Sequence, residues 1–279
     1  MTSHYRHSLS VLTVATALCA GLYAVGSYLT AYIPSPWGFG QFRPAVVIPA
    51  LFATIFGPMP AGIGAALGTL INDSVKHMTL YPGSLIAAVP GNFIGFYLFG
   101  YIVKKKFSWK RFILASNVTL TLANLIVAFL YVFFFKTVFL GDLEFQLANL
   151  TFLSIGLTIY WFVTMLPFVL VITPPLIRAV VVSFPSIVPS QVRTHTLEEE
   201  LPTTTFKLAM LIPGLAMLVI GLVTAFPSIG GYFFANLGGV TRILIPAMFY
   251  VSGAALSLLS VLLFTKSVDG SKTHGHQKS

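Results

Sequence analysis

The chain has 279 residues, of which 56% are hydrophobic and only 8% are charged, and its formal net charge is +9. Soluble domains carry about 25% charged residues, so this composition excludes an ordinary soluble protein. It predicts an all-α fold, a polytopic transmembrane helical bundle. The positive charge does not indicate nucleic-acid binding, because Lys and Arg gather in the cytoplasmic loops of membrane proteins. The single Cys19 cannot form an intrachain disulfide.

The chain begins with a short basic segment that leads into a long apolar stretch. This stretch, 8–33, is too long for the apolar part of a signal peptide, so we predict a retained first transmembrane helix that ends at Pro34-Ser35-Pro36. Small residues recur on one face of it at i, i+3, i+4 and i+7, namely Ala17, Ala20, Gly21 and Ala24. Such a face either packs against another helix of the same chain or docks a second membrane subunit.

Residues 41–73 form the stretch around which the prediction is built. Two apolar runs, 45–56 and 61–71, are joined by Gly57-Pro58-Met59-Pro60. Each run spans roughly 17–18 Å as a helix at about 1.5 Å per residue, which falls short of a bilayer core of about 30 Å. Broken segments of this kind need protein or a water-filled cavity around them and point to a solute site. We therefore predict a kinked pair of half-length helices beside a hollow.

Five more apolar segments follow the hairpin. They predict helices over 83–103, 112–135, 147–171, 206–226 and 240–264. Pro167 and the Pro174-Pro175 pair predict that the third of these is either bent or broken, and a break would leave 176–182 as a separate interfacial turn.

The predicted organisation has four parts. A six-helix membrane domain covers 1–183, and a cytoplasmic linker with three prolines covers 184–205. Within this linker Thr196 and Glu199 have the spacing of a helix capping box. A two-helix membrane extension (206–265) and a polar tail (266–279) complete the chain.

The distribution of basic residues predicts the orientation in the membrane. With the N-terminus in the cytoplasm and eight crossing segments, the inner loops hold 12 of the 16 Lys and Arg residues and the outer loops hold 4. The cluster at 104–111 dominates this difference. The positive-inside rule therefore predicts a multi-pass cell-membrane protein with both termini in the cytoplasm and the outer ends of the hairpin at the exterior.

Several motifs and side chains that enzymes and ion-coupled carriers need are missing from the sequence. It contains no P-loop of the form GxxxxGK[ST] and no HExxH motif. All six histidines and all seven Asp and Glu residues fall outside the predicted spans. Ion-coupled carriers usually need carboxylates within the membrane, so a self-powered carrier is disfavoured. We expect no enzyme activity, no cofactor and no metal, and assign no catalytic residue.

What remains is a polar cluster at the outer side, next to aromatic helix ends. We assign solute-binding roles to six residues: Arg43, Asn72, Asp73, Asn92, Tyr160 and Trp161. Arg43 and Asp73 cap the two arms of the hairpin, where they either pair as a structural clamp or bind polar ends of the solute. Asn92 is either a satisfied core amide or a solute contact. Polar neighbours such as Lys76, His77 and Tyr131 are interpreted as solvated loop residues or as part of an interfacial aromatic belt.

Three segments resemble the substrate-binding S components of energy-coupling factor (ECF) transporters. They are ALCAGLYAV, QFRPAVVIPALFATIFGPMPAGIGAALGTLIND and GSLIAAVPGNFIGFYLFGYIVKK. The resemblance covers about residues 8–183, the six-helix length of that family, and leaves the last two helices outside. It implies a small membrane protein that captures a micronutrient, typically a vitamin, and associates with a transmembrane coupling subunit and two cytoplasmic ATPases. The family's Ala-x-x-x-Ala docking motif matches Ala20 and Ala24.

The sequence thus predicts a substrate-capture subunit of an ECF-type uptake transporter, with its pocket between the hairpin and the fourth to sixth helices. Two alternatives stay open: an accessory subunit of a larger membrane complex that the last two helices contact, and a self-contained carrier or channel. The substrate is not predicted, because Arg43 and Lys76 would suit an anion while the aromatic side chains would suit a ring.

Overall fold

The computed structural model describes residues 7–35, 37–38, 40–144, 146–195, 203–228, 243 and 245–261. Helices dominate these ranges, in which the one strand-like pairing is an isolated bridge between Pro34 and Gln41. Five helices within the described ranges are long and apolar enough to cross a membrane, so the predicted all-α polytopic bundle is confirmed. The predicted polar tail and the predicted capping box at Thr196 and Glu199 lie outside the described residues.

The chain divides into two compact units, Met1–Glu199 and Glu200–Ser279. The first unit holds α1 (Leu9–Tyr28), η1 (Pro44–Val46), α2 (Val47–Phe56), α3 (Pro58–His77), η2 (Ser84–Ala88), α4 (Val89–Lys104), α5 (Trp109–Phe129), η3 (Leu130–Phe139), α6 (Leu147–Ser183), η4 (Pro185–Ile187) and α7 (Ser190–Thr194). The second unit holds α9 (Thr203–Ala225) and a helix over Ile245–Val261.

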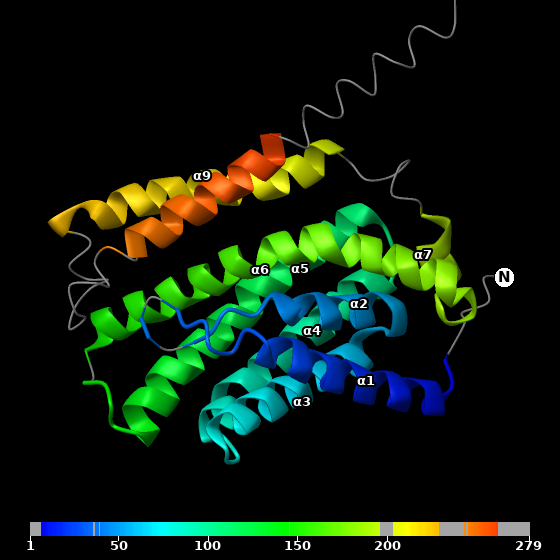
Figure 1. Ribbon diagram of the computed structural model, residues 1–279, viewed down its shortest axis with the longest axis horizontal. Helices are drawn as coiled ribbons and strands as arrows, with labels where there is room; N and C mark the ends of the chain where they lie inside the picture. Colours follow the sequence, from blue (N-terminus) through cyan, green and yellow to red (C-terminus); the bar gives the residue numbers. More distant parts are fainter. Residues whose placement is uncertain are drawn as a thin grey trace, which may run out of the picture. The chain divides into compact units, whose positions relative to one another are not determined.

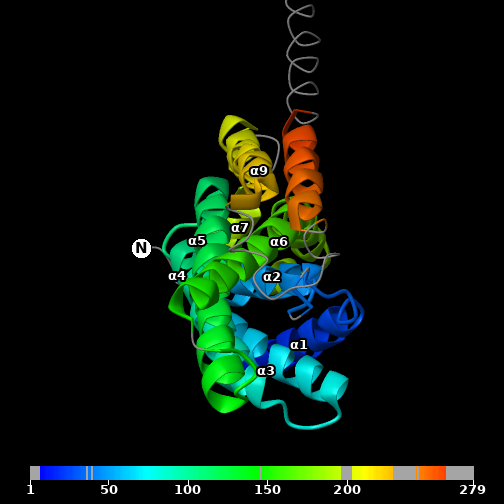
Figure 2. The ribbon, with the colours of Figure 1, turned by 90° about the vertical axis from the view of Figure 1, so that its left-hand side faces the viewer.

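The first unit is a helical bundle with the short α2 at its centre (Figure 1). Around α2, helix α1 packs on α3, α3 on α4, α4 on α5 and α5 on α6. Helix α2 contacts α1, α3, α4 and α6, and Figure 2 shows it between α6 on one side and α1 and α3 on the other. This arrangement explains why α2 is apolar on nearly every face, because a helix surrounded by others is hydrophobic all round.

Helix α1 begins at its N-cap Ser8, whose hydroxyl accepts a hydrogen bond from the Val11 amide, and it ends at Tyr28 rather than at the predicted Ile33. It packs closely on α3 because α3 presents glycines there. A Cβ atom added at Gly64 would lie 2.6 Å from Cys19 Cβ, and one added at Gly68 would lie 2.8 Å from the Ala20 carbonyl oxygen. Small residues at such an interface let two membrane helices approach closely.

The hairpin differs from the prediction in its second arm. The first arm is short, as expected, and turns at Gly57, whose φ of +90° favours glycine. The second arm, α3, is a full 20-residue helix, so the prediction of two half-length helices is wrong. Pro58 and Pro60 fall in the first turn of α3, where proline is tolerated, and the helix continues through Asp73 because buried partners satisfy that side chain.

Helix α6 is continuous over 37 residues and contains Pro167, Pro174 and Pro175, so the predicted break after Val171 is wrong. Proline removes a backbone donor, but neighbouring helices and local adjustments compensate for this loss in membrane bundles. Pro174 is itself buried in the bundle. Helix α5 likewise continues as the π-helix η3 to Phe139, four residues beyond the predicted end, with Leu140 N donating to Phe135 O.

In the described part of the second unit, two helices pack through small residues. A Cβ atom added at Gly253 would lie 2.7 Å from the Gly214 carbonyl oxygen, and one added at Gly214 would lie 3.0 Å from the Ser257 amide nitrogen. The Ser260 hydroxyl donates to the Lys207 carbonyl oxygen at 2.9 Å. These contacts make α9 and its partner a close-packed helical pair of the kind that small residues favour in membranes.

Candidate solute-binding site

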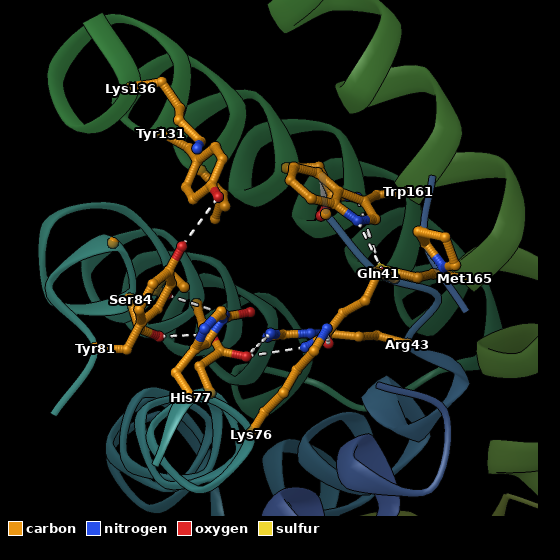
Figure 3. A pocket seen from close by; sticks show the side chains of 18 of the residues that line it. Gln41, Arg43, Lys76, His77, Tyr81, Ser84, Tyr131, Lys136, Trp161 and Met165 are labelled. Carbon is orange, nitrogen blue, oxygen red and sulfur yellow. Dashed lines mark hydrogen bonds and ion pairs between the residues drawn. The ribbon is translucent and has the colours of Figure 1, made fainter. Parts of the chain in front are cut away.

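A cavity of about 300 Å³ opens in the first unit, close to the C-terminal end of α3 (Figure 3). This volume lies within the range of small-molecule sites, about 300–1,000 Å³. The side chains that bring polar or aromatic chemistry to the lining are Tyr23, Gln41, Arg43, Asp73, Lys76, His77, Tyr81, Ser84, Asn92, Asn124, Tyr131, Lys136, Trp161 and Met165. They come from α1, the 34–43 loop, α3, η2, α4, α5, η3 and α6, so the cavity exists only when the whole bundle has formed.

Asp73 is the centre of the polar network in the cavity wall. Its Oδ1 atom accepts hydrogen bonds from Gln41 Nε2 at 2.9 Å, from Asn72 Nδ2 at 2.7 Å and from Arg43. Its Oδ2 atom accepts from Ser84 Oγ at 2.7 Å. Each oxygen of an ionised carboxylate accepts about two hydrogen bonds, so Oδ1 is saturated by its three donors, while Oδ2 accepts one. Asp73 therefore acts mainly by positioning its neighbours.

Arg43 and Asp73 form an ion pair, and their side chains are only 11% and 9% exposed. Arg43 also donates to Thr69 Oγ1. The two residues thus form the clamp that was one of the two alternatives from the sequence, joining the start of η1 to the last turns of α3. Asp73 also corrects the prediction that every carboxylate lies outside the helical spans, because it sits inside α3.

A second set of contacts fixes the loop that leads to Arg43. Trp161 Nε1 donates to the Gln41 carbonyl oxygen at 3.1 Å, which joins α6 to this loop. Lys76 Nζ lies 2.6 Å from the Ala31 carbonyl oxygen and 3.2 Å from Gln41 Oε1, and donates to both. Gln41 is therefore held by its main chain and its side chain at once, a role that no motif in the sequence indicates.

Aromatic rings form one wall of the cavity. The rings of His77 and Tyr81 stack in parallel, with centroids 4.0 Å apart and planes 6° from each other. The hydroxyl groups of Tyr81 and Tyr131 lie 3.0 Å apart in a hydrogen bond between the α3–η2 turn and η3 (Figure 3). Burial raises the pKa of Tyr81, so its hydroxyl stays protonated near neutral pH and can serve as a hydrogen-bond donor.

Two carboxamides line the cavity from α4 and α5. Asn92 Nδ2 donates to the Ala88 carbonyl oxygen at 2.9 Å, and Asn124 Nδ2 lies 3.8 Å from Met165 Sδ. The second contact is weak because a thioether sulfur is a poor acceptor. An asparagine both donates and accepts hydrogen bonds, so these side chains can bind a ring edge that carries carbonyl and N–H groups. The described residues show no group of three or more His, Cys, Asp or Glu side chains that could hold a metal.

Of the six residues assigned as solute-binding, four line the cavity and two do not. Arg43, Asp73, Asn92 and Trp161 line the cavity, whereas Asn72 and Tyr160 are buried outside its lining. Asn72 acts through its bond to Asp73. Conversely, Lys76, His77 and Tyr131, interpreted from the sequence as solvated or interfacial, do line the cavity. Lys76 and His77 reach the cavity because α3 extends to His77, and Tyr131 reaches it from η3.

Of the four residues assigned to partner docking, two are buried and two are exposed. Ala20 and Ala24 are buried, at 5% and 6% exposure, and Ala20 lies against Gly68 of α3. Ala17 and Gly21, beside them on the same helix face, are exposed, and a Cβ atom added at Gly21 would meet nothing within 4 Å. The small-residue face was predicted either to pack within the chain or to dock a second subunit. Ala20 packs within the chain, and of the four residues only Ala17 and Gly21 remain accessible.

A family model described as "ECF-type riboflavin transporter, S component" matches residues 9–180. The match covers more than half of the 279 residues, includes all the helices that line the cavity and ends before α9. No curated protein and no solved structure matches the chain.

Proposed function

Because the chain belongs to the S component family of ECF-type riboflavin transporters, it is a substrate-binding transporter subunit, and we propose that its solute is a flavin or a related ring vitamin. The observation that carries this proposal is the cavity of about 300 Å³, which combines aromatic walls with a few fixed polar groups. Small-molecule sites typically have this composition, because apolar surface supplies affinity while placed polar groups supply orientation.

A flat heteroaromatic solute suits the walls of the cavity. The His77–Tyr81 stack offers a rigid ring face, and Trp161 is held in place by its bond to Gln41. A flavin ring carries carbonyl and N–H groups along one edge, which complement the carboxamides of Asn92 and Asn124. Aromatic pairs contribute about 0.5–1.5 kcal/mol beyond the area they bury, so stacking and edge recognition together support selective binding.

We further propose that the cavity opens to the exterior. The cavity end of the first unit carries Arg43, Lys76 and Lys136. The α4–α5 turn, at the other end, lies beside the Gly57 turn of the hairpin, where a Cβ atom added at Gly57 would come 3.6 Å from Lys104 Cδ. That end carries seven basic residues of the first unit: Lys104, Lys105, Lys106, Lys110, Arg111, Arg178 and Arg193. The positive-inside rule places this end in the cytoplasm.

The energy for uptake is proposed to come from separate subunits, a transmembrane coupling subunit and cytoplasmic ATPases. The sequence contains no P-loop, and Asp73 is ion-paired with Arg43 and accepts from three further donors, so it does not offer an unpaired carboxylate for ion coupling. The exposed face of α1 around Ala17 and Gly21 is the proposed docking surface, because small exposed residues permit close approach of another membrane helix.

Equilibrium binding of a panel of radiolabelled vitamins to the purified protein tests this proposal. We expect saturable binding of riboflavin and no accumulation when the protein alone is placed in liposomes. Failure of every vitamin to bind a correctly folded protein would refute the proposal and favour an accessory subunit. Accumulation by the lone protein would instead establish a self-contained carrier.

A further inference from the structure

We propose that the cavity is built for a solute that carries an anionic group, and that Lys76 is the residue that binds this group. This inference rests on the proposed function, because it names the class of solute for the same cavity. It follows from the balance of charge in the lining and from the partners that each charged side chain has.

The charges that line the cavity do not cancel. Among the described lining residues, the cations are Arg43, Lys76 and Lys136, while Asp73 is the sole carboxylate. Asp73 pairs with Arg43 and also accepts from Gln41, Asn72 and Ser84. Its single negative charge offsets one of the three cations, so the lining keeps an excess of positive charge.

Lys76 holds this excess charge next to the cavity. Its ammonium group contacts only neutral oxygens within hydrogen-bond distance, those of Ala31 and Gln41, and neither of the two ion pairs in the described part of the chain includes it. An ammonium group has three donors, and these two contacts use two of them. The nearest carboxylate, Asp73, is ion-paired with Arg43, and the Arg43 charge opposes its attraction for Lys76. A bound anion would therefore stabilise this half-buried cation further.

Lys136 has a different role at the cavity. It forms an ion pair with Asp142 at 2.8 Å, and the Asp142 side chain is 50% exposed. An exposed pair of this kind is weak, so Lys136 adds positive potential without needing the solute for its charge balance. The asymmetry between the two lysines assigns the anionic group of the solute to Lys76.

A phosphate or carboxylate attached to a ring system fits this arrangement. The ring would contact the His77–Tyr81 stack and Trp161, while the anionic group would accept a charge-assisted hydrogen bond from Lys76, a class of bond roughly twice as strong as a neutral one. Flavin mononucleotide is a direct probe, because it differs from riboflavin only by the phosphate group.

The test compares the dissociation constants of flavin mononucleotide and riboflavin for the purified protein at fixed salt. A hydrogen bond to a charged group contributes about 1.5–3 kcal/mol, so we expect flavin mononucleotide to bind about tenfold or more tightly. Lys76→Gln should abolish this preference, measured as the ratio of the two dissociation constants in the same variant so that any loss common to both flavins cancels, and Lys76→Arg should retain it. Lys105→Gln is the control, because Lys105 lies over the Tyr101 ring and outside the cavity lining.

The outcomes separate this inference from the proposed function. Riboflavin binding without a preference for flavin mononucleotide would overturn the inference and leave the function in place. Loss of the preference in Lys136→Gln, with the preference retained in Lys76→Gln, would show that the assignment to Lys76 is wrong. Failure of both flavins to bind would refute the proposed function and this inference with it.

Discussion

Replacing Asp73 by Asn should destabilise the first unit strongly, although the two side chains have nearly the same shape. The substitution leaves Arg43 buried without its counter-charge, with its side chain only 11% exposed. Removing one partner of a buried ion pair destabilises proteins by about 3–5 kcal/mol, because the other charge remains uncompensated. Asn can still accept from Gln41, so the Arg43 charge accounts for most of the expected loss.

Asp142→Asn provides a matched control for the same chemical change. Asp142 pairs with Lys136, but its side chain is 50% exposed, and exposed pairs contribute about 0–1 kcal/mol. The two variants should therefore differ by about 2 kcal/mol or more in the free energy of unfolding. This comparison isolates burial, since both substitutions remove one carboxylate charge from an ion pair.

Detergent-induced unfolding of the purified protein, followed by far-UV circular dichroism, measures this difference. We expect Asp73→Asn to shift the midpoint far more than Asp142→Asn, and to weaken solute binding because Gln41 and Ser84 lose their fixed partner. Equal shifts for the two variants would refute the view that Asp73 holds the wall of the cavity together. A double variant, Arg43→Met with Asp73→Leu, should recover part of the stability, because it removes both charges.

Three further predictions follow from the packing and the cavity. Gly64→Ala should lower stability by about 1–3 kcal/mol in the same unfolding assay, because the new methyl group would lie 2.6 Å from Cys19 Cβ; a midpoint unchanged from the parent would contradict the α1–α3 packing. Trp161→Phe keeps the ring but loses the bond to the Gln41 carbonyl oxygen, so titration should show riboflavin affinity reduced about two- to tenfold. Leu at both Ala17 and Gly21 should abolish uptake by the assembled transporter while binding to the isolated subunit persists, and normal uptake would exclude this face as the docking surface.

The bundle was predictable from sequence, but the ends of its helices were not. Apolar periodicity located every long helix, because membrane-crossing segments are long and strongly hydrophobic. It failed at the end of α3, where polar residues from Asn72 to His77 looked like a loop. The sequence could not show that Asp73 has buried partners in the 34–43 loop and in η2, and these contacts allow the helix to continue.

The candidate site was predictable only in part, for a related reason. Arg43 and Asp73 were found because they flank one hairpin, and Trp161 because it is an aromatic residue beside the predicted hollow. Nothing in the sequence assigned Gln41 and Asn124 to the cavity, because they lie far apart along the chain. They meet at the cavity only through the packing of α5 and α6. The break expected at Pro174-Pro175 was wrong because proline is a weaker helix breaker inside a membrane bundle than in water.

The cavity beside α3 is, in this proposal, the place where the solute binds. Quenching of riboflavin fluorescence by the purified protein tests this most directly, with Ala88→Phe as a variant that fills the cavity from η2. Ala88 lines the cavity, and a phenylalanine there would occupy the space that the ring needs. We predict saturable quenching with one riboflavin per protein and none with Ala88→Phe. Quenching that persists unchanged in the filled variant, or its absence in the parent protein, would contradict the account.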